Sequence, residues 1–510
     1  MKKIIFSRIV MVGLLMLLQI IFLVVSILKL SESFVYLYVF FVVLSIVVVI
    51  YIVSRKDNPS YKLAWTIQVL LFPLFGGLFY LLFGGNKIRK KLKKQLNENY
   101  KKTEKLLVQD EEIIEEINNL DKNICSEVKY IKNFSNFPIY KNTISEYLSP
   151  GEKFFERLIA EIKKAKHYIF MEYFIISEGL MWDTVLGVLQ EKVKEGVDVR
   201  LIYDDVGCIT TLPRNYNKKL EAMGIKTLIF NEVMPVLSGV VNNRDHRKIT
   251  VIDGHTAFTG GCNLADEYIN EIVRFGHWQD ASLLIKGDAV WSFTIMFLQI
   301  WESLREETGD TDLSKFKPKV NYSGDFKNDG YVQPYGDSPY DTELVGENVY
   351  LNIINKAKDY VYINTPYLII DNELVTALTL AAKSGVDVRI ITPHIEDKWY
   401  VHIITRAYYS QLIEAGVKIY EYTPGFIHSK TFVSDDEIAV VGTINMDYRS
   451  LYLHFECGVF MYNTQTVNVM KNDFFKIMEK SQRVTIEDTK DVKWYIVLLR
   501  AILKVFAPLM

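Results

Sequence analysis

HRKITVID at residues 246–253 and HSKTFVSD at residues 428–435 share the spacing H-x-K-x4-D. The agreement continues beyond the octapeptides, because a glycine follows each histidine at +14 (260 − 246 and 442 − 428) and an asparagine follows at +17. One match to so short a motif is weak evidence. Two matches in the same register indicate that a segment carrying one site has been duplicated.

Each motif is expected to lie on a β-hairpin. Its members are the candidate catalytic residues, which are His246, Lys248, Asp253, His428, Lys430 and Asp435. The His and Lys stand at i and i+2 and therefore leave the same face of a strand. The Asp meets a turn signal, Asp-Gly in one copy and Asp-Asp in the other, so it would hold the hairpin or a second layer of contacts.

These residue types suit the displacement of an alcohol from a phosphodiester. The reaction needs a nucleophile, donors for the non-bridging oxygens and an acid for the leaving oxygen. One neutral histidine would attack phosphorus, and the other, protonated, would donate to the leaving alcohol. The two lysines would supply positive charge, and Asn263 and Asn445, the residues at +17, would supply amide donors. We expect the two histidines to titrate as a coupled pair.

A carboxylate that fixes the tautomer would assist a nucleophilic histidine. One candidate follows each motif: Asp280 in HWQD after the first and Glu456 in LHFECG after the second. Their offsets differ (280 − 246 = 34 and 456 − 428 = 28), so either could instead be an ordinary carboxylate at the end of a strand. No cluster of carboxylates and histidines stands out in the sequence, and we expect neither a metal nor another cofactor.

The internal repeat extends well beyond the motifs. AKHYIFMEYFI (from residue 165) resembles AKDYVYINTPY (from residue 357), and GVDVRLIYDD (from residue 196) resembles GVDVRIITPH (from residue 385). Strands alternating with helices predict an α/β fold, here two similar lobes related by a pseudo-two-fold axis. We place the lobes at 136–320 and 321–485, a charged helical linker at 86–135 and an amphipathic segment at 486–510.

Composition narrows the class of partner. The net charge is −2, which gives no broad cationic field for a nucleic acid. The four cysteines lack metal-ligand or disulfide spacing and are expected to be reduced. Three apolar segments lie within residues 1–85, at 9–28, 34–53 and 63–83, and each is long enough to cross a bilayer.

The apolar region predicts a multi-pass membrane anchor. The first segment is too long for a signal peptide and lacks a small-residue cleavage site. The third contains Pro73, Gly76 and Gly77, so it either spans or enters and returns. Basic residues cluster at 2–8, 55–62 and 87–94. The positive-inside rule favours two spans plus a re-entrant segment, with cytoplasmic lobes.

The motifs resemble those of the phospholipase D superfamily, and the wider match is to bacterial cardiolipin synthases. NPSYKLAWTIQVLLFPLFGGLFYLLFG (residues 58–84) is similar to the amino-terminal membrane motif of that family, and GGCN, GTINMDYRS and the apolar ending LLRAILKVFAPLM are also similar. Family members usually have Asn-Phe-Glu where this chain has His454-Phe455-Glu456. Glu456 is retained, and only the neighbouring position departs.

The resemblance implies a phosphohistidine mechanism. It also implies phosphatidyl transfer between two phosphatidylglycerol molecules, which gives cardiolipin and glycerol. The expected partners are these lipids and the bilayer, with no nucleic acid, and a homo-oligomer is compatible with the sequence. A membrane-bound phospholipase D-type hydrolase or headgroup transferase would share every catalytic residue. A nuclease is disfavoured by charge and by the apolar segments, and an inactive scaffold by the two intact motifs.

Overall fold

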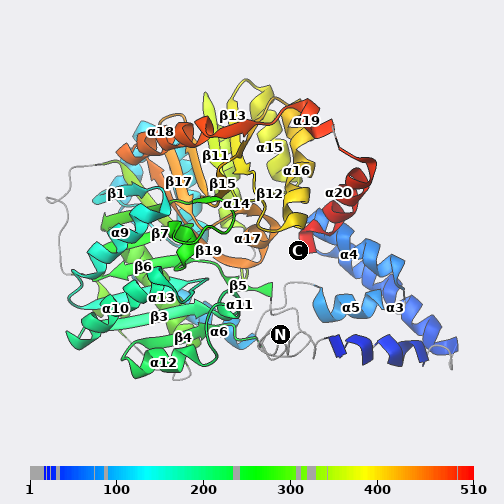
Figure 1. Ribbon diagram of the computed structural model, residues 1–510, viewed down its shortest axis with the longest axis horizontal. Coiled ribbons are helices and arrows are strands. Elements are labelled where there is room, and N and C mark those ends of the chain that lie inside the picture. Colours follow the sequence, from blue (N-terminus) through cyan, green and yellow to red (C-terminus); the bar gives the residue numbers. More distant parts are fainter. Residues whose placement is uncertain are drawn as a thin grey trace.

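The computed structural model describes residues 17–18, 20–22, 24–29, 35–73, 75–84, 90–233, 242–305, 312–318, 329–341, 343–490 and 492–509. Two α/β lobes make up most of the molecule (Figure 1). Helices from near the two ends of the chain lie together at one side of the lobes. The predicted α/β fold with a repeated lobe is confirmed.

The first lobe is built on a seven-stranded sheet in the order β1-β9-β7-β6-β2-β3-β4. Its strands are β1 (Thr143–Leu148), β2 (Tyr168–Tyr173), β3 (Asp198–Asp204), β4 (Lys226–Phe230), β6 (Lys248–Ile252), β7 (Thr256–Gly260) and β9 (Ser282–Gly287). Strands β2, β3 and β4 are parallel, and the other pairs are antiparallel. The first motif therefore lies on the β6–β7 hairpin at the centre of the sheet.

The second lobe repeats this topology. Its strands follow the order β10-β19-β17-β16-β11-β13-β14, and one further strand, β20, pairs with β14. They are β10 (Tyr331–Asp337), β11 (Tyr360–Asn364), β13 (Asp387–Pro393), β14 (Lys418–Tyr422), β16 (Thr431–Ser434), β17 (Ile438–Gly442), β19 (His454–Tyr462) and β20 (Ser481–Arg483). Each strand of the first lobe thus has a counterpart, and the β16–β17 hairpin carries the second motif.

Helices connect and cover the strands of each lobe. Those of the first lobe are α9 (Gly151–Ile162), α10 (Leu180–Lys194), α11 (Asp205–Cys208), α12 (Tyr216–Ala222), α13 (Val290–Leu304), η2 (Asp266–Ile269) and η3 (Leu313–Phe316). Those of the second are α14 (Val345–Lys356), α15 (Asn372–Lys383), α16 (Trp399–Glu414), α17 (Tyr448–Tyr452), α18 (Gln465–Glu479) and α19 (Ile486–Lys490). Helices α10 and α15 connect the parallel strand pairs β2–β3 and β11–β13.

The two lobes share a core. Ile249 and Val251 of β6 belong to the same buried apolar cluster as Val441 of β17 and Val459 of β19. Helix α13 contributes to this cluster and contacts strands of both lobes. Because apolar burial is the main favourable term in folding, the shared cluster holds the two sheets in one fixed arrangement.

Three helices occupy most of the stretch predicted as a charged linker: α6 (Lys90–Glu104), α7 (Glu111–Leu120) and α8 (Lys122–Ser135). Leu92 and Leu96 of α6 are buried in the core shared by the lobes. Ile124 and Val128 of α8 are buried in the core of the second lobe. The helical character agrees with the sequence, but these helices pack on both lobes and are not a freely solvated connector.

Two very short strand pairs cross between the lobes. Strand β5 (Arg244–Asp245) of the first lobe pairs with the start of β19, and β15 (Gly425–Ile427) of the second pairs with β8 (His277–Gln279) of the first. A further short pair, β12 (Leu368–Ile369) with β18 (Met446–Asp447), stays within the second lobe. The exchanged strands end directly before His246 and His428.

The helices outside the lobes are α3 (Val35–Ser54), α4 (Pro59–Leu71) and α5 (Gly76–Phe83), which contact one another. The helical structure is interrupted between α4 and α5 near Pro73, in the middle of the third predicted apolar segment. Half of the first segment, 9–28, lies outside the described residues. Among the helices that are described, none combines the length and the apolar character needed to cross a bilayer.

The carboxyl-terminal segment forms α20 (Trp494–Phe506) and η4 (Ala507–Leu509). Leu503, on the apolar face that the sequence indicates, packs toward the core of the second lobe. A second apolar face is exposed and includes Trp494, Tyr495, Val497, Leu498 and Ile502. Helix α20 also contacts α4, so the carboxyl-terminal helix lies against a helix of the amino-terminal region (Figure 1).

Candidate active site

The histidines and lysines of both motifs come together between the lobes. All four side chains are buried, with exposures of 7% for His246 and His428 and 1% for Lys248 and Lys430. Both histidines line one cavity of about 650 Å³, which receives residues from each lobe. The rest of the enclosing wall is largely aromatic and cationic. The duplicated motifs therefore build one composite site.

Each histidine is held by the opposite lobe. The backbone N–H of His246 donates to the carbonyl oxygen of Phe455 at 2.9 Å, and that of His428 donates to the carbonyl oxygen of Gln279 at 2.7 Å. Nδ1 of His246 lies 2.9 Å from Oε1 of Glu456. Nδ1 of His428 lies 2.7 Å from Oδ2 of Asp280. The exchanged strands thus set the position of both imidazoles.

This arrangement corrects the pairing drawn from the sequence. Asp280 follows the first motif and Glu456 follows the second, but each carboxylate binds the histidine of the other motif. The unequal offsets from the preceding histidine no longer matter, because neither carboxylate serves that histidine. Both carboxylates are fully buried, and both engage Nδ1, which leaves each Nε2 free for chemistry.

Burial and neighbouring cations keep the imidazoles neutral. Burial, and then the charges of Lys248 and Lys430, hold the pKa of His246 well below its ordinary value. Burial, and then Lys430, lower the pKa of His428 to about 4. Burial alone would raise the pKa of Asp280, but His428 and Lys430 outweigh it and lower that pKa. A neutral histidine with an ionised carboxylate on Nδ1 is a nucleophile or a general base.

The lysines lie behind the histidines. Nζ of Lys248 donates to the carbonyl oxygen of His246 at 2.6 Å, and Nζ of Lys430 donates to that of His428. Burial is the main cause that lowers the pKa of Lys248 to about 7 and that of Lys430 to about 8. Their charge at neutral pH is therefore sensitive to anything that enters the cavity. A phosphate anion would favour the charged forms.

The two aspartates of the motifs do not join the site. Asp253 accepts backbone hydrogen bonds from residues 166–168, each at 2.8 Å, and Asp435 accepts them from residues 358–360 at 2.8–3.0 Å. Each aspartate ends its strand in the left-handed region, with φ at 52°. Five strand residues place Asp253 about 16 Å from Lys248. Both aspartates thus fasten their hairpins, which is the role that the turn signals predicted.

The two asparagines at +17 both line the cavity. Asn263 is already engaged: Oδ1 accepts from the N–H of Ile175 at 3.0 Å, and Nδ2 donates to the Tyr268 hydroxyl at 2.7 Å. Asn445 is 5% exposed, and its Oδ1 has no hydrogen-bond partner among the described residues. Of the two, Asn445 is therefore better placed to bind a substrate hydroxyl.

Several residues of the cavity were not singled out from the sequence. Its cationic side chains are Arg244, Arg274, Lys398 and Arg449, and its large rings include Phe174, Tyr268, Phe275, Trp278, Tyr367 and Tyr400. Arg244 is 2% exposed and binds Asp204 at 2.8–3.0 Å. Such scattered single residues give no periodic signal, so the fold alone assembles them. Three carboxylates, Glu267, Asp397 and Asp447, line the same cavity and partly balance these cations. The rings suit the apolar part of a ligand.

His454, which the sequence marks as a departure from the family pattern, also lies in the site. It stands two positions before Glu456 on β19, so both side chains leave the same face of the strand. Its ring centroid lies 5.5 Å from that of His246. The i, i+2 spacing is a signal that the sequence did contain, and it brings a histidine–carboxylate cluster into a site where the sequence suggested none.

Comparison with known proteins agrees with this geometry. A family model described as "Cardiolipin synthase, PLD-like domain" matches residues 158–274 and 350–478, and one described as "Phospholipase D-nuclease N-terminal" matches residues 43–85. A solved structure, phosphatidylserine synthase of Haemophilus influenzae, aligns with a TM-score of 0.55 at 14% identity and covers 75% of this chain and 98% of that one. The fold and the paired motifs define a phospholipase D-like protein.

Curated relatives narrow the family. A protein named cardiolipin synthase from Halalkalibacterium halodurans is 34% identical over 91% of this chain and 91% of its own. A cardiolipin synthase 2 from Bacillus cereus is 36% identical over 86% of this chain and 84% of its own. A Streptococcus mutans protein without an assigned function is 43% identical over 91% of this chain and 99% of its own. The chain belongs to the cardiolipin synthase family.

Proposed function

We propose that this protein transfers a phosphatidyl group from one phosphatidylglycerol molecule to another, forming cardiolipin and releasing glycerol. The observation that carries the proposal is the pair of buried neutral histidines, each with a carboxylate on Nδ1, opening on one cavity. Family membership and the names of the curated relatives point to the same activity. One phosphodiester is broken and one is made, so no external energy source is needed.

The proposed reaction has two displacements. Nε2 of His246 attacks phosphorus, and His428, protonated after the lipid phosphate has entered, gives its proton to the leaving glycerol oxygen. The product is a phosphatidyl group on His246 together with free glycerol. His428 then removes the proton from a headgroup hydroxyl of the second lipid, which attacks phosphorus and releases His246. Lys248 and Lys430 stabilise the charge that develops on the non-bridging oxygens.

The roles of the two histidines differ in this proposal, although their surroundings are similar. We assign the nucleophile to the first lobe, as the family resemblance suggests. His428 must gain a proton during the cycle, and its Nδ1 lies within 2.9 Å of Nζ of Lys430. Because Nδ1 is held by Asp280, the proton that His428 gives to the leaving alcohol is carried on Nε2.

The proposal places the protein at the bilayer where both lipids reside. Helices α3 and α4 expose many apolar side chains, and helix α20 adds Trp494, Val497 and Leu498. We propose that residues 1–85 anchor the chain as a multi-pass region and that the lobes lie on the cytoplasmic side. Reporter fusions after Val53 and after Lys94 test this topology; an external signal from the second would contradict it.

The activity is tested by incubating the purified full-length protein with phosphatidylglycerol vesicles labelled in the terminal glycerol. Formation of cardiolipin with an equal amount of free labelled glycerol supports the transferase. Phosphatidic acid with glycerol would instead identify a hydrolase, and a new phospholipid formed only after addition of another alcohol would identify a headgroup transferase. Either of these last results contradicts the proposal.

A further inference from the structure

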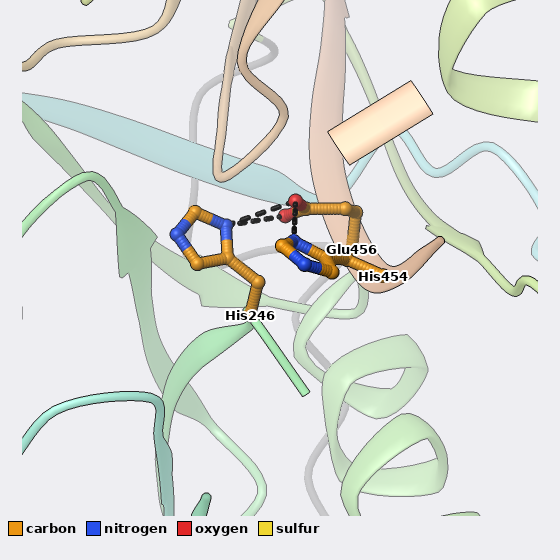
Figure 2. A group of neighbouring side chains, drawn as sticks. All are labelled: His246, His454 and Glu456. Carbon is orange, nitrogen blue, oxygen red and sulfur yellow. Dashed lines mark hydrogen bonds and ion pairs between the residues drawn. The ribbon is translucent and has the colours of Figure 1, made fainter. Parts of the chain in front are cut away.

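A buried cluster of three metal-ligating groups lies beside the first catalytic histidine: His246, His454 and Glu456 (Figure 2). One donor atom from each residue lies within 4.8 Å of the other two. Nδ1 of His246 is 2.9 and 3.1 Å from the two oxygens of Glu456, and Nδ1 of His454 is 3.7 Å from Oε1. A single small ion could therefore reach all three.

His454 is the residue that the proposed reaction does not use. Its side chain is only 9% exposed, and neither ring nitrogen has a hydrogen-bond partner within the part of the chain that the structure describes. A buried polar group without a partner destabilises the fold. A metal ion that accepts the lone pair of an imidazole nitrogen would give that nitrogen a partner.

The corresponding place in the other lobe cannot bind a metal. Trp278 stands two residues before Asp280, as His454 stands two residues before Glu456. The indole has no free nitrogen lone pair, and its Nε1–H donates to Oδ2 of Asp280 at 3.3 Å. At this position, therefore, only the second lobe supplies a side chain that can coordinate a metal.

We propose that His246, His454 and Glu456 form a binding site for Zn²⁺ that silences the active site. Two imidazoles and one carboxylate are a ligand set that zinc accepts, with distances near 2.0–2.2 Å to each donor. A tetrahedral ion needs donors somewhat more than 3 Å apart, so closing the cluster takes side-chain shifts of about 1 Å or less. His246 and His454 both line the cavity, so an ion can reach the cluster from that side.

The charges around the cluster make the site selective. The Lys248 ammonium lies near enough to Glu456 for the two charges to interact, and it opposes any added cation. Mg²⁺ and Ca²⁺ prefer oxygen ligands and hold their water strongly. Only an ion with high affinity for imidazole nitrogen overcomes this repulsion, which favours Zn²⁺ over the hard cations.

The consequence for activity rests on the proposed function. Zinc on Nδ1 of His246 takes the place of the proton shared with Glu456. The carboxylate then serves the metal and no longer supports the imidazole, so Nε2 becomes a weaker nucleophile.

Binding is tested first, without reference to turnover. Zn²⁺ is titrated into the purified full-length protein in detergent micelles against a chromophoric zinc indicator. We expect one saturable site in the wild type and a loss of affinity of at least about tenfold in His454→Asn. Equal affinity in the two proteins, or no saturable binding, would overturn the proposal. Substitution with Co²⁺ should give the intense visible bands of a four-coordinate ion only in the wild type.

His394→Asn is the matched control. Nδ1 of His394 also pairs with a carboxylate, Glu421 at 3.0 Å, but Arg406 binds both oxygens of that carboxylate. This variant should bind Zn²⁺ as the wild type does; a parallel loss would place the ion elsewhere. Thermal melting separates binding from misfolding, because Zn²⁺ should raise the Tm of a folded wild type and of the control but not of His454→Asn.

The second arm measures turnover. Chelator-reversible inhibition of lipid transfer by Zn²⁺ should be weaker in His454→Asn by the same factor as binding, whereas inhibition that is equal in both proteins would refute the silencing role. If the protein binds Zn²⁺ as expected but makes no cardiolipin, the metal site stands and the proposed function fails. The two outcomes are therefore distinguishable.

Discussion

Trp278 and His454 occupy equivalent places in the two lobes, and each ring lies beside the catalytic histidine that its own lobe does not supply. The ring centroid of Trp278 is 5.2 Å from that of His428, and that of His454 is 5.5 Å from that of His246. The two halves thus match in topology and in carboxylate placement. The flanking ring is one of the features in which they differ, and it contributes to the unequal surroundings of the two histidines.

Replacing either catalytic histidine should abolish lipid transfer without unfolding the protein. His246→Ala and His428→Ala each remove one of the two proton-transfer or nucleophilic groups, and groups that act as a unit cannot substitute for one another. Cardiolipin formation from labelled phosphatidylglycerol should fall to background in both. Near-wild-type synthesis by either variant would refute the two-histidine mechanism, and a phosphopeptide mapped to residue 428 in rapidly quenched wild type would reverse the assigned roles.

The carboxylates should matter to the histidine of the opposite lobe. Asp280→Asn and Glu456→Gln keep the shape but lose the charge that selects the tautomer, and we expect a fall in kcat of about 10²- to 10⁴-fold for each. In Asp280→Asn the imidazole signal of His428, and not that of His246, should shift in the NMR spectrum of selectively labelled protein. A shift confined to His246 would contradict the exchange between lobes.

Activity and stability should respond to pH in opposite directions through the two lysines. The pKa of Lys248 is lowered to about 7 and that of Lys430 to about 8, so both lose their charge as pH rises through these values. Phosphate stabilisation is lost with that charge, and transfer should decline by about tenfold or more between pH 7 and pH 9.

The free energy of unfolding should change with pH in the direction opposite to activity. An unfolded lysine has a pKa near 10.4 and binds a proton that the folded one has lost, so these two groups make the free energy of unfolding rise with pH above about 7. The slope is at most about 1.4 kcal/mol per pH unit for each lysine. Buried carboxyls act oppositely in part of this range, since burial raises the pKa of Asp337 to about 8. The comparison is therefore between wild type and Lys248→Met/Lys430→Met, whose difference in unfolding free energy should vary with pH; a constant difference would contradict the assignment.

Asp253→Ala should destabilise the protein while sparing the chemistry. The carboxylate accepts three backbone hydrogen bonds at a residue with φ of 52°. Loss of these charge-assisted bonds and of a residue tolerant of that conformation should cost about 2–4 kcal/mol of unfolding free energy. Asp253→Asn keeps one acceptor oxygen and the conformational tolerance, so it should cost less. Denaturant unfolding measures both, and a lower kcat of fully folded Asp253→Ala would instead return this residue to the catalytic set.

Asn58 should control how helix α4 docks on the second lobe. Its Oδ1 caps the helix at Ser60, and its Nδ2 donates to Asp371 at 3.0 Å and to the Tyr452 hydroxyl at 2.8 Å. Asn58→Ser retains a cap, but its side chain is too short to contact Asp371 and Tyr452. Asn58→Asp retains the cap but places a carboxylate next to Asp371. Hydrogen exchange of the α4 amides should therefore increase more in Asn58→Asp than in Asn58→Ser. Equal exchange in both variants would show that the contact does not hold the helix.

The repeated lobe could be predicted because the hairpin requires particular residue types at fixed positions, and these residues recur in both copies. Gly260 and Gly442 mark places where the motif hairpin approaches the next strand: a Cβ on Gly260 would lie 2.5 Å from the Cα of Ser282, and one on Gly442 would lie 2.5 Å from the carbonyl oxygen of Cys457. Only glycine fits such a close backbone approach. The turn dipeptides after each motif likewise predicted where the aspartates end their strands.

The pairing of carboxylates with histidines was not predictable in the same way. It depends on strands of two or three residues that form between segments far apart in the sequence, and so short a strand shows no alternation. The unequal spacing from each motif to its following carboxylate also favoured no particular partner. The cluster of His454 with Glu456 was readable as an i, i+2 pair, but its proximity to His246 required the fold.

Gene duplication usually creates redundancy, in which one copy can lose its function while the other retains it. The exchanged strands remove that freedom here, since each half holds the carboxylate and the backbone acceptor on which the other half's histidine depends. A substitution that removes the carboxylate or the backbone contact in one lobe therefore impairs the histidine of the other lobe. Natural selection therefore acts on both copies at once, which accounts for two motifs that have kept the same register within one chain.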